Sequence, residues 1–415
     1  MKFTKQEKSW ILYDVANSAF VLLLSSTVPI YFRALGEQGG LADSTITSIF
    51  SLATSVSVLF IAFLGPILGA IADHKGMKKK LFTLALLIGL LGGFSISVTQ
   101  TWQAFLFMLV LARIGYSLCN VFYDSMLTDV TTNERMDSVS GAGFAYGYVG
   151  STIPFILGIT LVLTTPFGLS TMLATQISFL ITIVWWFLLS IPLLRDVKQT
   201  HYKEKDQHMM KNLGSQLVNT VKKIRNNKHM MYFLLGYFCY IDGVNTIISQ
   251  SASFGGEVGL DGNTMIIALL MTQFVAFPFA VLSGKLSAKF GQLNMLKFYI
   301  GIYIIVACVG FVMTQAWQFW LLAFMVGVAQ GGIQSLSRSY FGKLVPKQES
   351  NEYFGFFDIF GKFAEFLGPL LMVLSVSMFG QSKYGILALI VLFALGLYFI
   401  RKIEKLDPSE KIMSE

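Results

Sequence analysis

The sequence predicts an all-helical membrane protein with twelve spanning helices arranged as two halves of six. Three observations lead to this prediction: an apolar composition, a series of apolar stretches of spanning length, and an internal repeat. Of the 415 residues, 54% are hydrophobic and only 13% are charged. A soluble domain carries roughly a quarter charged residues. A chain of this length with so little charge cannot cover a water-exposed surface, so we expect it to lie in the bilayer.

Twelve stretches are long and apolar enough to span, because a spanning helix needs about 20 mainly apolar residues. They lie near residues 10–34, 44–72, 80–99, 102–127, 138–163, 170–193, 229–253, 263–286, 292–314, 317–340, 352–379 and 383–401. The first is too long for the apolar core of a signal peptide, so we expect a retained span. The polar stretch 195–228 is the candidate linker, and it separates an N-terminal bundle (1–194) from a C-terminal bundle (229–415).

The basic residues predict the orientation of these spans. With the N-terminus inside, nearly all of the 31 Lys and Arg residues lie in inner segments, while Arg33 and Lys383 lie outside. Translocation of Lys and Arg is disfavoured. The pattern therefore predicts that both termini and the linker are cytoplasmic.

An internal repeat supports the division into two halves. Three pairs of landmarks lie 215 residues apart: Gly69 and Gly284, Trp102 and Trp317, and Pro154 and Pro369. Parallel halves of six spans, related by an axis along the membrane normal, are the architecture of major facilitator transporters. The repeat therefore predicts two bundles around a central cavity.

A loop between the second and third expected spans carries a recognisable motif. Residues 69–78 read GAIADHKGMK and resemble the loop motif of the major facilitator superfamily at this place. Gly69, Asp73, Gly76 and Lys78 match, whereas two positions that are usually basic hold other residues. Glycine permits a tight turn, and Asp73 can accept hydrogen bonds from a neighbouring helix N-terminus. The resemblance implies a gating loop; the alternative is a basic inner loop that serves only topology.

Further stretches resemble a narrower branch of the superfamily. These are SWILYDVANSAF at 9–20, YIDGVNT at 240–246 and GGIQSLSRS at 331–339, continued by YFGF at 353–356 and GKF at 361–363. They are similar to the branch that includes the fungal vacuolar amino-acid effluxers and related bacterial permeases. The resemblance spreads along nearly the whole chain. It implies a secondary transporter in which spans one, four, seven and ten line the cavity, and amino-acid efflux is the best-known activity of eukaryotic members.

Two acid–amide pairs lie within expected spans, Asp14 with Asn17 and Asp242 with Asn245. Ionisable groups inside a membrane are costly, so they face a cavity or a partner. A spacing of three residues puts both side chains on one helix face. Such a pair could bind an amine, accept a proton or hold a gate closed. For Asp14 the alternative is a structural cap near the helix end.

A single arginine, Arg113, lies eleven residues into the fourth expected span. This is about 16 Å along the helix axis, near the bilayer midplane. A guanidinium at this depth requires a carboxylate or an anionic ligand. It predicts substrate or proton coupling, with a salt bridge between helices as the alternative. The family resemblance also places Gln334 of span ten in the cavity.

Span eleven carries three charged residues on one helix face, Asp358, Lys362 and Glu365. Opposite charges at these spacings can neutralise each other. One interpretation is a self-paired network that packs this span against another helix. In the other, Glu365 is the proton carrier and Lys362 tunes its pKa.

Three tryptophans lie near expected helix ends, Trp10, Trp185 and Trp186. Tryptophan is enriched where spans meet the membrane–water interface. The sequence therefore predicts that all three are interfacial anchors.

Several classes of function are excluded by what the sequence lacks. It has no GxxxxGK[ST] nucleotide loop, and the linker is too short for an ATPase domain. The three cysteines are far apart and the four histidines lie in loops or at span ends, so we expect no metal, no cofactor and no enzyme. The net charge of +8 sits in short loops, which indicates membrane topology rather than nucleic-acid binding.

The sequence thus predicts a monomeric secondary transporter in a bacterial cell membrane. We expect alternating access, with proton-coupled efflux of a small polar solute such as an amino acid. Its expected partners are that solute, the proton as coupling ion and the lipid bilayer. Two alternatives stay open: a flippase or exporter of a lipid-linked or amphipathic substrate, and a non-transporting membrane sensor.

Overall fold

A computed structural model describes residues 2–204, 209–257, 259–313, 315–379 and 383–406. Within these residues the regular structure is helical, apart from one isolated bridge between His74 and Lys203. The α-helices are α1 (Lys5–Ser25), α2 (Thr27–Gln38), α3 (Asp43–Ala72), α4 (Met77–Val98), α5 (Trp102–Ser125), α6 (Leu127–Val130), α7 (Met136–Thr164), α8 (Thr171–Asp196), α9 (Met209–Asn226), α10 (Lys228–Glu257), α11 (Gly262–Phe290), α12 (Gln292–Val312), α13 (Ala316–Leu344), α14 (Ser350–Phe379) and α15 (Lys383–Ile403).

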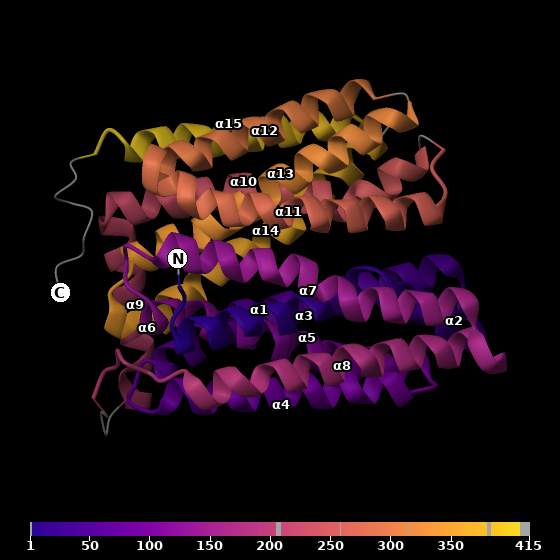
Figure 1. Ribbon diagram of the computed structural model, residues 1–415, viewed down its shortest axis with the longest axis horizontal. Coiled ribbons are helices and arrows are strands. Elements are labelled where there is room, and N and C mark those ends of the chain that lie inside the picture. Colours follow the sequence, from indigo (N-terminus) through magenta and orange to yellow (C-terminus); the bar gives the residue numbers. More distant parts are fainter. Residues whose placement is uncertain (1, 205–208, 258, 314, 380–382, 407–415) are drawn as a thin grey trace.

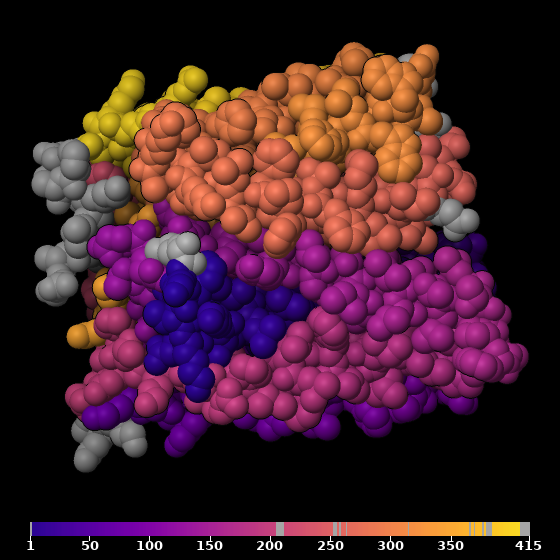
Figure 2. All heavy atoms as spheres, in the orientation of Figure 1, coloured from indigo at the N-terminus to yellow at the C-terminus, as the bar shows by residue number. Residues whose placement is uncertain are grey.

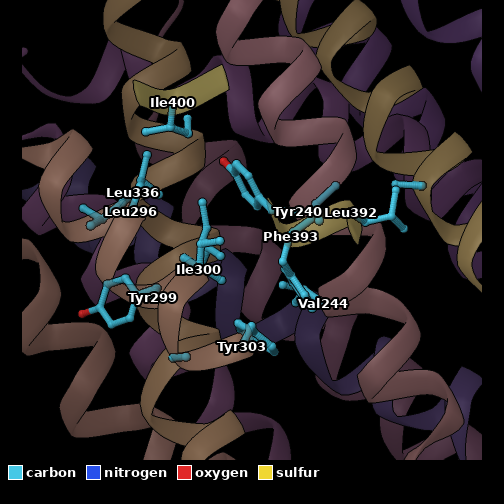
Figure 3. Close-up of a cluster of buried hydrophobic side chains, with 14 of the residues drawn as sticks. Tyr240, Val244, Leu296, Tyr299, Ile300, Tyr303, Leu336, Leu392, Phe393 and Ile400 are labelled. Carbon is cyan, nitrogen blue, oxygen red and sulfur yellow. The ribbon is translucent and has the colours of Figure 1, made fainter. Parts of the chain in front are cut away.

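The helices form two bundles that lie side by side (Figure 1). Helices α1–α8 make one bundle and α10–α15 the other, and each has its own cluster of buried apolar side chains. Figure 3 shows part of the second cluster, where Tyr240, Tyr299, Tyr303 and Phe393 point into the bundle. The bundles meet along α7 and α11, whose surfaces adjoin in the space-filling view (Figure 2). We call the end that holds the N-terminus and α9 the linker end.

Eleven helical segments in the described part of the chain are long and apolar enough to cross a membrane. The 30-residue α14 lies between two of them in sequence and takes the place of the eleventh of twelve spans. The first span is divided in two, because α1 ends and α2 begins around Ser26. The expected all-helical fold of two six-span halves is therefore confirmed.

The first helix begins earlier than expected, at Lys5 rather than near residue 10. Thr4 caps it, and Glu7 completes a capping box in which each residue bonds the backbone of the other. Asp14 therefore lies in the third helical turn, and the interpretation of Asp14 as an end cap is wrong. Asp242 lies fourteen residues after the start of α10, whereas Asp14 lies nine residues after the start of α1. The two acid–amide pairs therefore lie at different positions within their helices.

The repeat has a structural counterpart where the bundles touch. Gly69 of α3 packs on the first turn of α14, and a Cβ added there would collide with the carbonyl of Asn351. Gly284 of α11 packs on the first turn of α7, where an added Cβ would lie 2.9 Å from the carbonyl oxygen of Asp137. The contacted helix starts keep nearly the same offset, since Asn351 follows Asp137 by 214 residues (351 − 137 = 214). Each half thus presses a glycine against a helix start of the other half.

The expected interfacial role of the tryptophans is wrong for two of the three. Trp10 and Trp186 are fully buried. The Nε1 of Trp10 donates to the carbonyl of Tyr123 over 2.9 Å, and the two rings stack with centroids 4.5 Å apart. Trp185 is partly buried and donates to a backbone carbonyl of α1. These rings therefore pack inside the N-terminal bundle instead of lying at the membrane surface.

Candidate functional site

A buried arginine joins the two bundles near the linker end. Arg338 extends from α13, and its Nη2 donates to Asp14 Oδ2 of α1 over 2.9 Å. Its Nη1 donates to Asp124 Oδ1 of α5 over 3.0 Å, and its Nε donates to Ser140 Oγ of α7 over 3.0 Å. All of these acceptors belong to the N-terminal bundle. Charge-assisted bonds of this kind are about twice as strong as neutral ones, so they hold the bundles together here.

Aromatic rings surround the same guanidinium. Its carbon lies 4.2 Å from the ring centroid of Phe144, 4.6 Å from that of Trp10 and 5.4 Å from that of Tyr123. Ring faces attract cations, most strongly when water is excluded. The rings therefore stabilise a charge whose side chain is only 4% exposed. We call Arg338, Asp14, Asp124, Ser140 and the three rings the arginine layer.

Sequence reasoning missed Arg338. It lies near the expected end of the tenth span, where membrane topology alone explains a basic residue. Its partner Asp14 is 324 residues away in the chain, so no local spacing indicates the pair. One sequence feature could have indicated Arg338. It follows Gln334 by four residues, so both side chains lie on the same face of a helix that is predicted to line the cavity.

The loop motif forms a second layer of contacts nearer the linker end. Asp73, one residue after α3, accepts hydrogen bonds from the backbone N–H groups of Asn351 (2.9 Å) and Glu352 (3.1 Å) in the first turn of α14. A helix N-terminus attracts a carboxylate in this way. Burial raises the pKa of the Asp73 carboxyl to about 7, against the opposing effects of Lys78 and Asn351. Gly76 turns the loop with a φ of 74°, which suits glycine.

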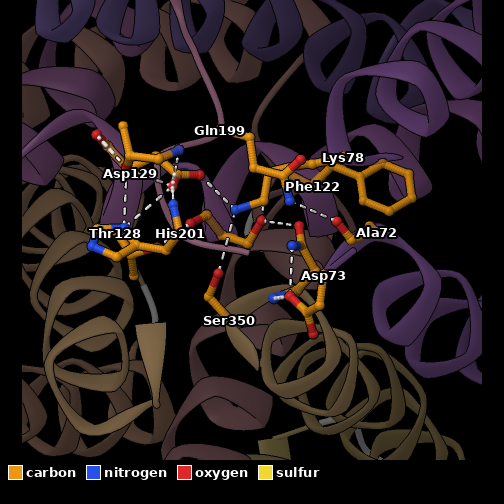
Figure 4. A network of polar contacts seen from close by, with 12 residues as sticks. Ala72, Asp73, Lys78, Phe122, Thr128, Asp129, Gln199, His201 and Ser350 are labelled. Atoms are coloured by element: carbon orange, nitrogen blue, oxygen red, sulfur yellow. Dashed lines mark hydrogen bonds and ion pairs between the residues drawn. The ribbon is translucent and has the colours of Figure 1, made fainter. Parts of the chain in front are cut away.

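Lys78 links this loop to both bundles (Figure 4). Its Nζ lies 2.6 Å from Asp129 Oδ2 at the end of the fourth span, and both side chains are almost completely buried. The same Nζ donates to Ser350 Oγ of α14 over 3.3 Å. Gly69, Asp73 and Lys78 therefore lie at the junction between the bundles, while Gly76 is exposed and its backbone N–H donates to Gln199 Oε1 of the linker over 2.9 Å. We call Asp73, Lys78, Asp129 and the start of α14 the loop layer.

Part of the linker is bound into the loop layer. The other oxygen of Asp129 accepts from the backbone N–H groups of Thr200 and His201, each over 2.9 Å. Lys203 exchanges backbone hydrogen bonds with the loop, and its Nζ lies 3.0 Å from Glu349 of the C-terminal bundle. Burial disfavours ionisation of Glu349, but Lys203 and Lys223 outweigh it and hold its pKa below the usual value. We call residues 197–204 the linker strap.

Asp137 supplies the carboxylate at the repeat-related contact. It accepts from Ser287 Oγ over 2.8 Å and from Gln292 Nε2 over 2.9 Å, and Lys343 Nζ lies 2.6 Å away. In the second half Ala288 stands where the repeat would place an equivalent of Asp73. At this second contact the carboxylate is therefore supplied by Asp137 of the N-terminal bundle. In both contacts a carboxylate makes polar contacts at the start of a helix.

Polar side chains continue from the arginine layer toward the other end of the molecule. Asn17 Nδ2 donates to Asn120 Oδ1 over 3.0 Å, and the hydroxyl of Tyr148 donates to Gln334 Oε1 over 2.6 Å between the bundles. Arg113 is partly buried on α5, seven residues before Asn120. Seven residues are two helical turns, so both lie on one face of α5. Gln334 therefore lies at the seam between the halves, whereas Asn17 and Arg113 lie on α1 and α5 of the N-terminal bundle.

Asp242 has a different environment from the acids of these layers. It is fully buried in α10, and its Oδ1 accepts from the backbone N–H of Gly368 in α14 over 2.8 Å. Within the described residues its Oδ2 has no hydrogen-bond partner, and the same holds for the buried Oγ1 of Thr246 one turn later. Asn245 is partly buried on the same helix. A buried carboxylate without a compensating cation is costly.

The charged residues of span eleven lie on α14, where Asp358 and Lys362 are both partly buried. Glu365 falls within the same helix, but its side chain lies outside the described residues. In the described part of the chain, no group of three or more His, Cys, Asp or Glu side chains could hold a metal ion.

The loop layer yields a testable stability effect. Lys78→Ala leaves Asp129 buried without its cation, which typically costs about 3–5 kcal/mol. We expect a large loss of unfolding free energy for the purified protein in micelles, followed by thermal or denaturant unfolding. Lys75→Ala is the matched control in the same loop, because the Lys75–Glu204 pair is exposed to solvent and such pairs contribute little to stability. Equal stabilities of the two variants would contradict a structural role for the buried pair.

The fold and this junction define a class of protein, the multi-pass membrane transporters of the major facilitator superfamily. The structure is similar to that of the human organic anion transporter MFSD10, with a TM-score of 0.75 at 14% identity, covering 95% of this chain and 99% of that one. It is also similar to the major facilitator transporter FucP in its outward conformation, with a TM-score of 0.72 at 15% identity, covering 96% and 97%.

Sequence comparison then gives the family. The family model described as "Vacuole effluxer Atg22 like" matches residues 4–136 and 128–405, and the chain belongs to this family. It is 42% identical to the MFS-type transporter YxiO of Bacillus subtilis over 407 residues, which cover 96% of this chain and 95% of that protein. It is 25% identical to autophagy-related protein 22 of Kluyveromyces lactis, covering 94% and 91%. These findings confirm the family resemblance, and the protein is a transporter rather than an enzyme.

Proposed function

We propose that this transporter couples proton movement to the export of a small polar solute such as an amino acid. The observation that carries the coupling is Asp242, a fully buried carboxyl group with one oxygen bound by Gly368 N–H and the other without a hydrogen-bond partner among the described residues. By contrast, Asp14, Asp124 and Asp129 each have an Arg or Lys partner. A carboxyl group with no cation nearby is best accommodated in its neutral form. Asp242 is therefore suited to bind a proton in this state and release it in another.

The distribution of contacts supports alternating access. Hydrogen bonds and ion pairs between the bundles gather at the linker end and reach inward as far as Tyr148 and Gln334. We take the linker end to be cytoplasmic, since the loops there carry most of the Lys and Arg residues. In this state the loop layer and the arginine layer would close the cytoplasmic side. For the space between the bundles to open to the cytoplasm, both layers must separate.

The polar side chains predicted to line the solute path indicate the class of solute. Arg113 offers fixed donors for a carboxylate, while Asn17, Asn245 and Gln334 offer amides that can donate and accept. This set suits a small zwitterionic or polar molecule. The name of the matching family, vacuole effluxer, supports export as the direction. For this chain we propose a bacterial cell membrane and a monomeric transporter.

The test uses purified protein in liposomes loaded with the pH-sensitive dye pyranine. Amino acids, peptides and sugars are added in turn, and the internal pH is recorded with liposomes of several lipid compositions. We expect at least one polar solute to cause a protein-dependent pH change in every lipid composition. Solute movement without any pH change would overturn proton coupling. Movement of lipid instead of solute would overturn the proposed substrate class.

A further inference from the structure

The C-terminal bundle contains a cavity of about 170 Å³ that the function proposed above does not use. It lies among α10, α11, α12 and α13, with Met372 of α14 and Ile386 and Leu389 of α15 completing its wall, in the part of the bundle farther from the linker end. Most of its lining is apolar, including Met265, Ala307 and Ala323. Protein interiors are normally packed with few voids larger than a water molecule. A cavity of this size inside one bundle therefore calls for an explanation.

Aromatic rings occupy the matching place in the N-terminal bundle. There, between α2, α3, α5 and α8, Tyr31 and Phe32 pack on Phe105, Phe179 packs on Tyr31, and Phe50 packs on Phe32, with centroids 5.2–6.1 Å apart. The repeat relates one of these rings to the cavity wall, because Met265 follows Phe50 by 215 residues (265 − 50 = 215). At this pair of positions an aromatic ring in one half is replaced by a flexible, unbranched side chain beside the cavity in the other half.

The cavity has a polar edge. Gln273 and Gln330 line it, each less than 9% exposed. An amide side chain can both donate and accept hydrogen bonds. A ligand that carries a hydroxyl group can therefore bond to Gln273 at this edge. Thr246 also borders the cavity, but its Oγ1 is shielded from it and packs against Gly368 of α14.

We propose that the cavity binds a compact, uncharged, mainly apolar group of about the size of one substituted ring, with its polar edge at Gln273. A dry apolar cavity of about 150 Å³ in another protein is large enough to bind benzene. Thr246 lies one helical turn after Asp242, so an occupied cavity would fix α10 next to the proposed proton carrier. The proposal does not depend on transport, because binding to purified protein requires no gradient.

The probe is 4-fluorophenol, whose saturable binding to the purified protein in micelles is followed by fluorine NMR. Ala307→Phe and Ala323→Phe each place a ring in the cavity, and either variant is expected to weaken specific binding at least tenfold. Cys308→Phe is the matched control, since Cys308 is the next residue of α12 and is exposed. It is expected to bind the probe as the natural protein does. Equal binding by all four proteins would overturn the proposal.

A third variant tests the polar edge. Gln273→Met keeps the length of the side chain but removes its amide group, so it is expected to weaken 4-fluorophenol binding several-fold and leave fluorobenzene binding unchanged. If the binding of both probes weakens equally, or neither changes, Gln273 is not the polar edge, and this part of the proposal fails. The ligand has two possible sources, a ring that is part of the transported solute and a separate effector molecule, and transport kinetics distinguish them. 4-Fluorophenol competes with a solute that carries such a ring, whereas it changes only the maximal transport rate if the site belongs to a separate effector.

Discussion

Asp242→Asn is expected to abolish solute accumulation driven by a pH gradient, while exchange of solute across the membrane continues. The asparagine side chain has nearly the same shape and can still accept the bond from Gly368 N–H. It cannot bind or release a proton at any physiological pH. The fold and the solute path are therefore preserved, and only the coupling is lost. Because a single group carries the proton in this proposal, the loss is complete rather than partial.

The measurement compares two assays on the same liposomes. Accumulation against a concentration gradient is followed with an imposed pH difference, and exchange is followed with labelled solute on one side and unlabelled solute on the other. Asp43→Asn is the control, because Asp43 is an exposed carboxylate at the start of α3 and should behave like the natural protein. Gradient-driven accumulation by Asp242→Asn at the natural rate would show that another group carries the proton.

Arg338→Ala is expected to shift the transporter away from the state that is closed at the linker end. The substitution removes both ion pairs of the arginine layer and leaves Asp14 buried, with a side chain 7% exposed. Breaking such a buried pair typically costs about 3–5 kcal/mol. At about 1.4 kcal/mol for each factor of ten, the balance between the two states would change by at least about 100-fold. Transport that needs both states would fall accordingly.

The distance across the linker end reports this shift directly. Spin labels at Glu134 and Lys347, exposed residues on opposite bundles, are introduced into a chain without its native cysteines and measured by pulsed electron resonance. We expect a single short distance in the natural protein and a longer, broader distribution in Arg338→Ala. Replacing Asp14 and Asp124 by Ala in addition should restore part of the short distance, since no carboxylate is then left without its cation. An unchanged distribution in Arg338→Ala would contradict a gating role.

The architecture was predictable from the sequence because membranes impose simple local rules. Spanning helices must be long and apolar, and loops on one side collect Lys and Arg. These rules locate the spans without knowledge of any tertiary contact. The repeat adds long-range information, since Gly69 and Gly284 meet helix starts in the opposite bundles. The hydrogen bonds from a helix start to Asp73 were likewise expected from the loop motif.

The arginine layer was not predictable in the same way. Arg338 and Asp14 are partners only because α13 and α1 meet between the bundles, and no spacing along either helix records that contact. Trp10 shows the same limit, since its position near an expected helix end suggested an anchor, but the ring lies under Arg338 instead. The linker strap is held partly through its backbone, and those contacts leave no signal in the sequence. Tertiary contacts of these kinds become visible only in the structure.

The linker strap makes the closed state cooperative. Its backbone is bonded to the loop after α3, while the side chain of Lys203 reaches Glu349 in the other bundle. Separation of Asp73 from the start of α14 therefore stretches the contacts of the strap at the same time. Interactions that break together favour a switch between two discrete states over a graded series of partly open ones. A segment that connects the halves covalently thus also sharpens the transition between them.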